Sequence, residues 1–418
     1  MNCAPTNESL PHPRMQSIRQ RFSVEFSYDV HFTEGLFRPD NPLLADAVAD
    51  ASEPSPKKMV AVVDEGLLPH HEDLVEQIGA YAEAHADVLT LSASPIVVPG
   101  GEAAKNDPAL VDHIHEVIYE ARLDRHAYVL AVGGGAVLDL AGYAAGTAHR
   151  GIRLLRAPTT VLSQNDSGVG VKNGINAFDT KNFLGTFEPP HAVLNDVTVL
   201  RTLDDRDWRA GISEAIKVAL LKDADFFEYL REHAPDLAPP SRDLEAMKHV
   251  VYRCAELHLD HIATSGDPFE RGSSRPLDFG HWAAHKLEEK TDYALRHGEA
   301  VAIGLALDCA YSHLTGRLSR EGLTQILDLM AALGFDLYVP ELETRIDEPD
   351  DPRCLFQGLD SFREHLGGEL TIMLLDAIGD GVEVHAVDRA QYREAIALLR
   401  ERSAAASSPE RVASPDTS

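Results

Sequence analysis

The sequence predicts an α/β fold with a parallel sheet in its first half, followed by a mostly α-helical second half. In the first half, apolar runs of strand length alternate with segments of helical periodicity, a pattern typical of a parallel sheet covered by helices. Within residues 128–147 a strand, a glycine turn and a helix follow one another directly. From about Asp204 onward the chain consists mostly of amphipathic helical segments.

The first half yields a series of predicted elements. Residues 23–32 alternate as a strand does, and residues 59–65 form a continuous apolar run that ends in acidic residues, which is typical of a buried parallel strand. Residues 72–85 are predicted as a helix, 86–93 as a strand and 108–123 as a helix. The segment 128–147 then completes a strand–helix alternation that favours a parallel sheet.

The second half is predicted to hold six helices and a late hairpin. The helices are expected at 207–222, 224–232, 243–265, 281–290, 297–315 and 320–333. Two strands at 369–375 and 382–387 are joined by IGDG, a typical hairpin turn. Polar, Pro-containing or Ala/Ser/Pro-rich ends predict disorder. The expected organisation is therefore a disordered extension at 1–18, an α/β domain at 19–203, a helical domain at 204–402 and a disordered tail at 403–418.

Composition narrows the class of partner. The 418 residues include 38 Lys and Arg against 67 Asp and Glu, a net charge of −29. Such a surface repels nucleic acid and anionic lipid, so neither is an expected partner, and a small anionic substrate needs a local cationic pocket. The four cysteines have no paired spacing, and no apolar run is long enough to span a bilayer or resembles a signal peptide. A reduced, cytoplasmic setting is expected.

The first half contains two motifs that suit a nucleotide or phosphate. Three glycines at 133–135 lie between a strand and a helix, where backbone N–H groups can approach a pyrophosphate, although a ligand-free tight turn fits the same residues. Asp64 ends the earlier strand and is a candidate partner of a ribose hydroxyl, or a simple loop acid. Glu102 and Lys105 lie three residues apart at a helix start, a spacing that a solvated pair also shows.

The segment 150–187 combines glycines with many polar and basic side chains between apolar flanks. Glycine-rich loops that carry lysines bind phosphate through backbone donors and point charges, although an ordinary surface loop remains an alternative. In the following helix, Glu214 and Lys217 lie three apart on a face that is otherwise apolar. A buried carboxylate and ammonium need partners, which a metal site or an internal ion pair can supply.

Three histidines stand close together at 281, 285 and 297. His281 and His285 are four residues apart, so they share one face of a helix. Three protein ligands with an open position form the catalytic zinc pattern, whereas the alternative is a set of surface or core histidines in a chain that has 20 of them.

Taken together, five motifs in order resemble the dehydroquinate synthase superfamily, the sugar phosphate cyclases. They are AVGGGAVLDLAG, then APTTVLSQNDSGVGVKNGIN, SEAIK, DFGHxxxH and HGEAVAIG, and the resemblance covers about residues 20–400. It implies a dehydroquinate synthase-like fold, in which a Rossmann-like α/β domain binds NAD, a helical domain binds metal and substrate, and the active site lies between them.

The resemblance also implies roles for individual residues. The metal ligands, for zinc or alternatively cobalt, are Glu214, His281 and His297. The substrate-binding or proton-transferring residues are Asp166, Lys172, Lys181, Asn182, Lys217 and His285. Arg150 matches an arginine that the family donates to a phosphate across a homodimer interface. The NAD-binding positions are Asp64, Glu102, Lys105, Gly134, Gly135, Asp139, Thr159 and Thr160.

The chemistry that the resemblance implies has no net redox change. NAD transiently oxidises a secondary hydroxyl, phosphate leaves by β-elimination, the ketone is reduced again and an intramolecular aldol step closes a carbocycle. The metal polarises the carbonyl and hydroxyl oxygens. The partner is therefore expected to be a small sugar phosphate.

The sequence departs from dehydroquinate synthase where that enzyme binds a substrate carboxylate. Asp278 replaces the expected asparagine, Ser274 stands at the arginine position, and an ungapped count places Asp260 at the lysine position, while Arg275 is one residue off. Acids in place of cations repel a carboxylate. The run FREHLGG (362–368) resembles cyclases of sedoheptulose 7-phosphate, which has no carboxylate. These enzymes make 2-epi-5-epi-valiolone or 2-epi-valiolone, and NDSGVGVKNGIN is similar to the 2-epi-valiolone synthase and EboD-type branches.

The sequence therefore predicts a sedoheptulose 7-phosphate cyclase in which Asp278 binds a sugar hydroxyl. The alternative is 3-dehydroquinate synthase itself, if Arg275 reaches the carboxylate. A metal-dependent polyol dehydrogenase shares the two-domain plan, but it would show net turnover of NADH. An inactive scaffold is disfavoured because Glu214, His281 and His297 are all present.

Overall fold

A seven-stranded parallel sheet organises the first half of the chain. The computed structural model describes residues 17–50, 52, 56–178, 180–265, 269, 276–365 and 370–407. The strand order is β1-β9-β6-β5-β2-β3, with β4 also paired to β2, and every pairing in this sheet is parallel. The strands are β1 (Asp29–Thr33), β2 (Lys57–Asp64), β3 (Leu89–Leu91), β4 (Ile96–Val98), β5 (Tyr128–Gly133), β6 (Arg153–Pro158) and β9 (Ala192–Asp196).

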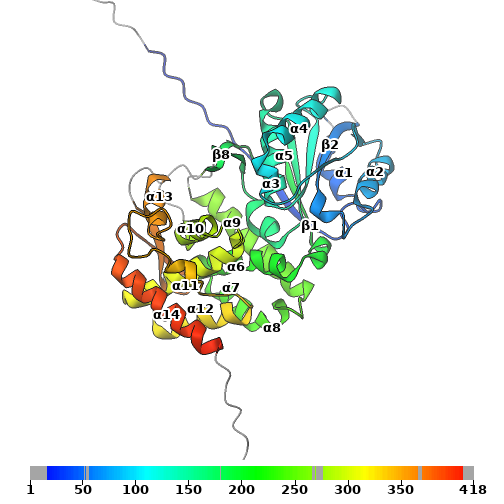
Figure 1. Ribbon diagram of the computed structural model, residues 1–418. Coiled ribbons are helices and arrows are strands. Elements are labelled where there is room, and N and C mark those ends of the chain that lie inside the picture. The colour runs from blue at the N-terminus through cyan, green and yellow to red at the C-terminus, as the bar shows by residue number, and fades with distance from the viewer. Residues whose placement is uncertain are drawn as a thin grey trace, which may run out of the picture.

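Helices cover both faces of this sheet, as Figure 1 shows. Alternate residues of β2 point to opposite faces: Val60 and Val62 pack with α4 and α5, whereas Ala61 and Val63 pack with α1 and α2. The helices of this half are α1 (Leu43–Val48), α2 (Leu74–Ala84), α3 (Ala103–Asn106), α4 (Pro108–Glu120) and α5 (Gly135–Thr147). The predicted α/β architecture is confirmed.

The predicted strand at 23–32 is wrong over most of its length. Strand β1 begins only at Asp29, and the preceding residues 17–28 form no regular element. Phe22, Val24 and Phe26 in that stretch are exposed, so their alternation does not reflect a buried sheet face. Of the terminal extensions predicted at 1–18 and 403–418, residues 1–16 and 408–418 lie outside the described residues.

An antiparallel hairpin interrupts the α/β alternation between β6 and β9. It consists of β7 (Lys172–Ala177) and β8 (Thr180–Phe187), which pair only with each other. This hairpin carries the polar residues of the glycine-rich segment and packs along α5. The sequence signals predicted a ligand-binding loop here rather than two strands.

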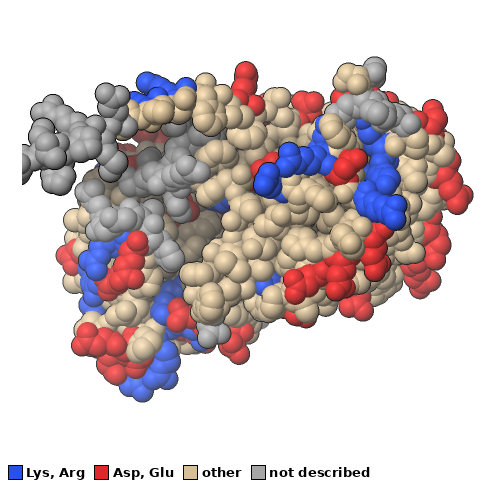
Figure 2. All heavy atoms as spheres, turned by 90° about the horizontal axis from the view of Figure 1, so that it is seen from above, with Lys and Arg blue, Asp and Glu red and all other residues tan. Residues whose placement is uncertain are grey.

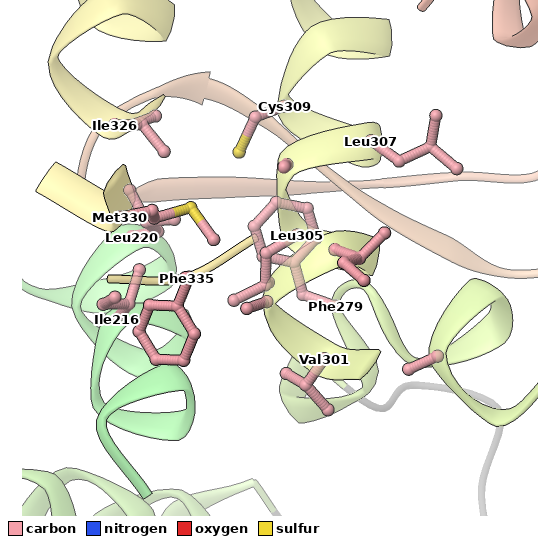
Figure 3. Packing of buried hydrophobic residues seen from close by; sticks show 14 of the residues in the cluster. Ile216, Leu220, Phe279, Val301, Leu305, Leu307, Cys309, Ile326, Met330 and Phe335 are labelled. Carbon is pink, nitrogen blue, oxygen red and sulfur yellow. The ribbon is translucent and has the colours of Figure 1, made fainter. Parts of the chain in front are cut away.

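The second half is a helical bundle around one apolar core. Its longer helices are α6 (Asp205–Lys222), α7 (Ala224–Glu232), α9 (Leu244–Thr264), α10 (His281–Lys290), α11 (His297–Leu314), α12 (Arg320–Ala332), α13 (Gln357–His365) and α14 (Arg389–Ser407), with the short α8 at Ala234–Leu237. Figure 3 shows how Ile216 and Leu220 of α6, Leu305 of α11 and Met330 of α12 meet in this core. The six predicted helices are all present, within two residues at each end.

A small antiparallel hairpin and α14 complete the bundle. Strands β10 (Ile372–Ala377) and β11 (Asp380–Val384) form the hairpin predicted from IGDG. Helix α14 continues to Ser407, four residues past Ser403, where the tail was predicted to begin. Among the helices described, none combines the length and apolar character that crossing a bilayer requires.

Candidate active site

Three metal-ligating side chains meet where α6, α10 and α11 converge. Glu214 comes from the middle of α6, while His281 and His297 are the first residues of α10 and α11. The Nε2 atoms of both histidines lie 3.7 Å from Glu214 Oε1. One ligand atom from each residue falls within 4.8 Å of the others, so a single ion can contact all three.

Glycines allow these helices to approach so closely. A Cβ on Gly298 would lie 2.3 Å from the Ala210 carbonyl oxygen of α6, and one on Gly304 would lie 2.0 Å from the Gly280 carbonyl oxygen. Gly280 itself has φ +76°, a left-handed conformation that glycine adopts without strain. The motifs DFGH and HGEAVAIG therefore place both histidines beside Glu214.

The surroundings of His281 prepare it as a neutral ligand. Its Nδ1 lies 3.0 Å from the Phe279 carbonyl oxygen, and donation of an Nδ1–H there leaves Nε2 with a lone pair toward Glu214. Burial, together with the charge of Lys217, lowers the pKa of His281 well below its usual value. A divalent metal requires this neutral form.

Glu214 lies among charges and is completely buried. Its Oε1 has no hydrogen-bond partner among the described residues, and its other oxygen pairs with Lys217. Burial raises the pKa of Glu214, and the Lys217 charge opposes that rise. A buried carboxylate oxygen without a donor is costly unless a cation binds it, so the residues present fit a metal ion.

Lys217 and Asp166 extend the charged cluster. Burial lowers the pKa of Lys217, but the carboxylates of Glu214 and Asp166 outweigh it, so the ammonium is retained. Burial also raises the pKa of Asp166, and the charges of Lys217 and His258 reverse this and bring it well below its usual value. Asp166 is thus a carboxylate and Lys217 an ammonium beside the candidate metal ligands.

His285 does not join the Glu214 set. It is exposed on α10 and belongs to a second group of ligand-type residues, formed by His285, Glu288 and His297. His297 is common to both groups. Its Nδ1 lies 3.3 Å from Glu288 Oε2, while its Nε2 faces Glu214.

A cavity of about 470 Å³ opens beside this cluster, where the surface is hollowed between the two halves (Figure 2). The hairpin β7–β8 supplies many of the lining residues, and Asp166 and His258 also line the cavity. Three residues predicted for the site also line the cavity, namely Lys172, Asn182 and Asp139. Of the described residues that line it, Lys172 alone has a lysine or arginine side chain.

Two predicted lysines form ion pairs at the edge of this cavity. Lys105 Nζ donates to Asp139 Oδ2 at 2.7 Å and also contacts Asn182 Oδ1. Lys181 Nζ lies 3.1 Å from Glu288 Oε1 of α10 and 3.9 Å from Glu102 Oε1. The structure therefore connects the residues predicted for NAD with those predicted for substrate.

The remaining predicted NAD-binding residues lie at the carboxyl ends of β2, β5 and β6. Asp64 Oδ2 accepts from the Gly134 N–H at 3.5 Å, and Thr159 and Thr160 follow β6. Gly134 precedes α5 without a side-chain cap, which leaves N–H groups at the helix N-terminus. A Cβ on Gly135 would lie 2.7 Å from Ser167 Oγ, so glycine lets the serine hydroxyl approach this turn. These features fit a dinucleotide.

Asp260 does not face the cavity, contrary to the ungapped count. It is exposed on α9, whereas His258, half a turn earlier, is 8% exposed and lies 3.0 Å from Asp166 through its Nδ1. The helical period decides this, because two residues on a helix differ by about 200° in direction. Asp278 is half-buried, and its charge acts on Lys217. Ser274 and Arg275, like residues 366–368 of FREHLGG, lie outside the described residues.

Arg150 lies apart from the cluster in its own chain. It is exposed after α5, with φ +67°, and is absent from the cavity lining among the described residues.

Sequence analysis missed His258, Glu288 and Arg156. The first two occur on amphipathic helices without a motif. Arg156 lies within an apolar strand, is fully buried and donates to the carbonyls of Gly168, Gly170 and Lys172, so it fixes the loop before β7. A charged residue inside an otherwise apolar strand is the signal that could have revealed it.

Comparisons with known proteins agree with this geometry. The family model described as 3-dehydroquinate synthase N-terminal matches residues 95–210, and the one described as 3-dehydroquinate synthase C-terminal matches residues 211–348. The 2-epi-5-epi-valiolone synthase of Streptomyces glaucescens is 34% identical over 361 residues, covering 86% of this chain and 87% of that protein. The 3-dehydroquinate synthase of Halorhodospira halophila is 36% identical over 332 residues, covering 77% and 89%.

A solved structure has the same fold. The 2-epi-5-epi-valiolone synthase of Streptomyces hygroscopicus subsp. jinggangensis, solved with NAD+ and Zn2+ bound, matches with a TM-score of 0.79 and 31% identity over 92% of this chain and 99% of that one. Because the family models cover more than half of the chain and these relatives cover most of it, the protein belongs to the 3-dehydroquinate synthase superfamily and is a sugar phosphate cyclase.

Proposed function

We propose that this cyclase converts sedoheptulose 7-phosphate into a C7 cyclitol, 2-epi-5-epi-valiolone or 2-epi-valiolone, with release of phosphate. The observation that carries the proposal is Asp278, which replaces an asparagine that dehydroquinate synthases use for a carboxylate and whose charge acts on Lys217 beside the candidate metal ligands. Identity to a 2-epi-5-epi-valiolone synthase supports the same assignment.

Glu214, His281 and His297 would hold a zinc ion, or cobalt in its place, and Asp64, Gly134, Gly135, Thr159 and Thr160 would contact NAD. Glu102, Lys105 and Asp139 complete the predicted NAD set. When bound, the metal supplies Lewis-acid polarisation and NAD supplies a transient hydride acceptor. The pairing of NAD+ with Zn2+ in the Streptomyces hygroscopicus structure supports this cofactor set.

The chain's own residues bind the sugar phosphate and move its protons. Lys172 and Asn182 line the cavity, and together with Lys181 of the same hairpin they would neutralise and orient the phosphate as it leaves. The Asp166 carboxylate, which Lys217 and His258 keep ionised, can accept a hydrogen bond from a sugar hydroxyl. His285, exposed on α10, is positioned for proton exchange with solvent.

The carboxylate of the dehydroquinate precursor finds a poor partner here. Each charge-assisted hydrogen bond that is lost costs about 1.5–3 kcal/mol, and a nearby acid adds repulsion. Two such losses correspond to a discrimination of roughly a hundredfold or more. Asp278 instead accepts from a hydroxyl, which a C7 ketose supplies.

The test is to supply NAD and a divalent metal and compare kcat/KM for phosphate release from the two substrates. We expect sedoheptulose 7-phosphate to be preferred at least a hundredfold. A preference for the carboxylate substrate would instead identify the protein as a 3-dehydroquinate synthase. That enzyme is the second candidate because of the 36% identity to it. NADH absorbance should stay constant during turnover, whereas a steady rise would indicate a polyol dehydrogenase.

A further inference from the structure

One buried carboxylate joins the candidate metal site to the candidate phosphate site. The Glu288 side chain on α10 is 5% exposed, and its two oxygens have different partners. Oε2 lies 3.3 Å from His297 Nδ1, and Oε1 lies 3.1 Å from Lys181 Nζ. Lys181 belongs to β8 of the first half, whereas Glu288 and His297 belong to the second. The same side chain therefore contacts both halves of the molecule.

The contact with His297 selects which nitrogen faces the metal cluster. A histidine that donates its Nδ1–H to a carboxylate presents the Nε2 lone pair, with the ring held in one orientation. Here Nε2 points to Glu214 Oε1 at 3.7 Å, in the three-residue metal set. His297 is 34% exposed, so packing alone does not fix its ring. Glu288 supplies that constraint.

The contact with Lys181 holds a mobile side chain against α10. Lys181 Nζ also lies 4.4 Å from the centre of the Tyr293 ring and 3.9 Å from Glu102 Oε1. The Glu288 oxygen is the nearest of these partners. This arrangement keeps the ammonium at the edge of the cavity, where a phosphate can replace a carboxylate as its counterion.

We propose that Glu288 is a positioning residue that orients His297 for metal binding through one oxygen and holds Lys181 for the substrate phosphate through the other. The proposal rests on the function proposed above for the metal and phosphate sites. A competing role is that of a metal ligand, because Glu288 also groups with His285 and His297 within 4.8 Å. Positioning is favoured because both Glu288 oxygens already have partners, whereas Glu214 Oε1 has none among the described residues.

The test measures zinc affinity by competition with a chromophoric chelator, without substrate or turnover. Glu288→Gln should bind zinc tenfold to a hundredfold more weakly, the usual effect of removing a partner of a metal-bound histidine. Glu289→Gln is the matched control, since Glu289 is the next residue on α10 and pairs with Lys286 at 2.7 Å. Its zinc affinity should equal that of the wild type.

A second variant separates the two contacts. Lys181→Met should raise KM for the sugar phosphate at least tenfold while leaving zinc affinity unchanged. The reason is that Lys181 contacts Glu288 Oε1, whereas His297 contacts Glu288 Oε2. If Glu288→Gln does not fold, Glu288→Asp, which retracts the carboxylate by one methylene, should weaken zinc binding at least threefold.

The proposal would be overturned if Glu288→Gln bound zinc with an affinity within twofold of the Glu289→Gln control. Glu288→Asp takes its place in this comparison if Glu288→Gln does not fold. A stoichiometry of two zinc ions per chain that falls to one in Glu288→Gln would also overturn the proposal, since it would make Glu288 a ligand. The zinc measurement does not depend on which sugar phosphate is turned over. A failed substrate assay and a failed zinc assay therefore remain distinguishable.

Discussion

At the scale of single residues, two histidines one helical turn apart on α10 have different environments. His281 is buried, donates to a backbone carbonyl and faces Glu214, whereas His285 is exposed and faces Glu288. The spacing HxxxH placed both on one helical face, and a helix turn of about 5.4 Å separates their positions along the axis. That displacement decides which of them can reach the carboxylate on α6.

The first prediction separates the two possible ligand sets. His281→Ala should weaken zinc binding at least a hundredfold and abolish activity, because it removes one of three ligands. His285→Ala should keep zinc affinity within about threefold and lower only kcat, since its role is in proton transfer. Chelator competition and phosphate release measure the two effects. Loss of zinc in His285→Ala with retention in His281→Ala would instead assign the metal to the His285 set.

The residue types of the site were more predictable from the sequence than the directions in which their side chains point. Glu214, His281 and His297 were predicted together, and the structure brings them together. By contrast, the ungapped count put Asp260 at the family's lysine position, whereas His258 is the α9 side chain that lines the cavity, because such a count ignores which face of α9 is buried. Direction on a helix depends on packing partners that only the tertiary structure supplies.

At the scale of elements, a buried carboxylate holds the junction of α10 and α11. Asp308 of α11 accepts from the Gly280 N–H at 3.1 Å, the Trp282 Nε1–H at 3.0 Å and the Tyr392 hydroxyl at 2.8 Å. Two of these donors flank His281, so the network sets the start of α10. Burial, which the three donors only partly offset, raises the pKa of Asp308 to about 7.

The second prediction follows from this raised pKa. The folded protein holds the Asp308 proton up to about pH 7, whereas the unfolded chain releases it near the ordinary aspartate pKa of 3.8. Between these values the folded state binds more protons, so this group's contribution to stability is full below about pH 4 and declines as pH rises toward 7, by up to about 1.4 kcal/mol per pH unit.

The control for this effect is Asp308→Asn, which cannot titrate. The free energy of unfolding of the wild type minus that of Asp308→Asn, from urea titrations at pH 5, 6, 7 and 8, should fall with pH and level off above 7. A difference that stays flat or rises across this range would contradict the assignment.

Loop conformations were the least predictable elements. The segment 150–187 was predicted to bind a ligand because of its glycines and lysines, but the hairpin β7–β8 and the burial of the Arg156 guanidinium were not predicted. Arg156 donates to backbone carbonyls that lie more than ten residues further along the chain. No short-range sequence propensity encodes such a contact. The six helices predicted in the second half match the observed ends within two residues because local and tertiary preferences agree there, whereas α13 and α14 were not predicted.

At the scale of the whole molecule, the exposed Arg150 leads us to predict that one chain alone does not complete the phosphate site. The residue ends the segment after α5, is exposed, and has no ion pair to any described residue. Family resemblance places an arginine here on the phosphate of a partner subunit. With a net charge of −29, the protein needs every local cation to attract an anionic substrate, so an arginine supplied from a second copy would add to Lys172 and Lys181.

The last prediction is therefore that the protein is a homodimer with shared sites. Arg150→Ala and Lys217→Ala should each lose most activity alone, through the phosphate contact and the charged cluster, respectively. After mixing and subunit exchange, half of the dimers carry one of each chain, and one of their two sites has both an intact Lys217 and a partner's intact arginine. The mixture should then recover about a quarter of the wild-type rate.

The control is Arg153→Ala. Arg153 is a nearby arginine on β6 that donates to the Tyr128 hydroxyl within its own chain, so this variant should need no complementation. A monomeric mass in solution together with no recovery on mixing would show that each chain completes its own phosphate site, and Arg150 would then have no catalytic role.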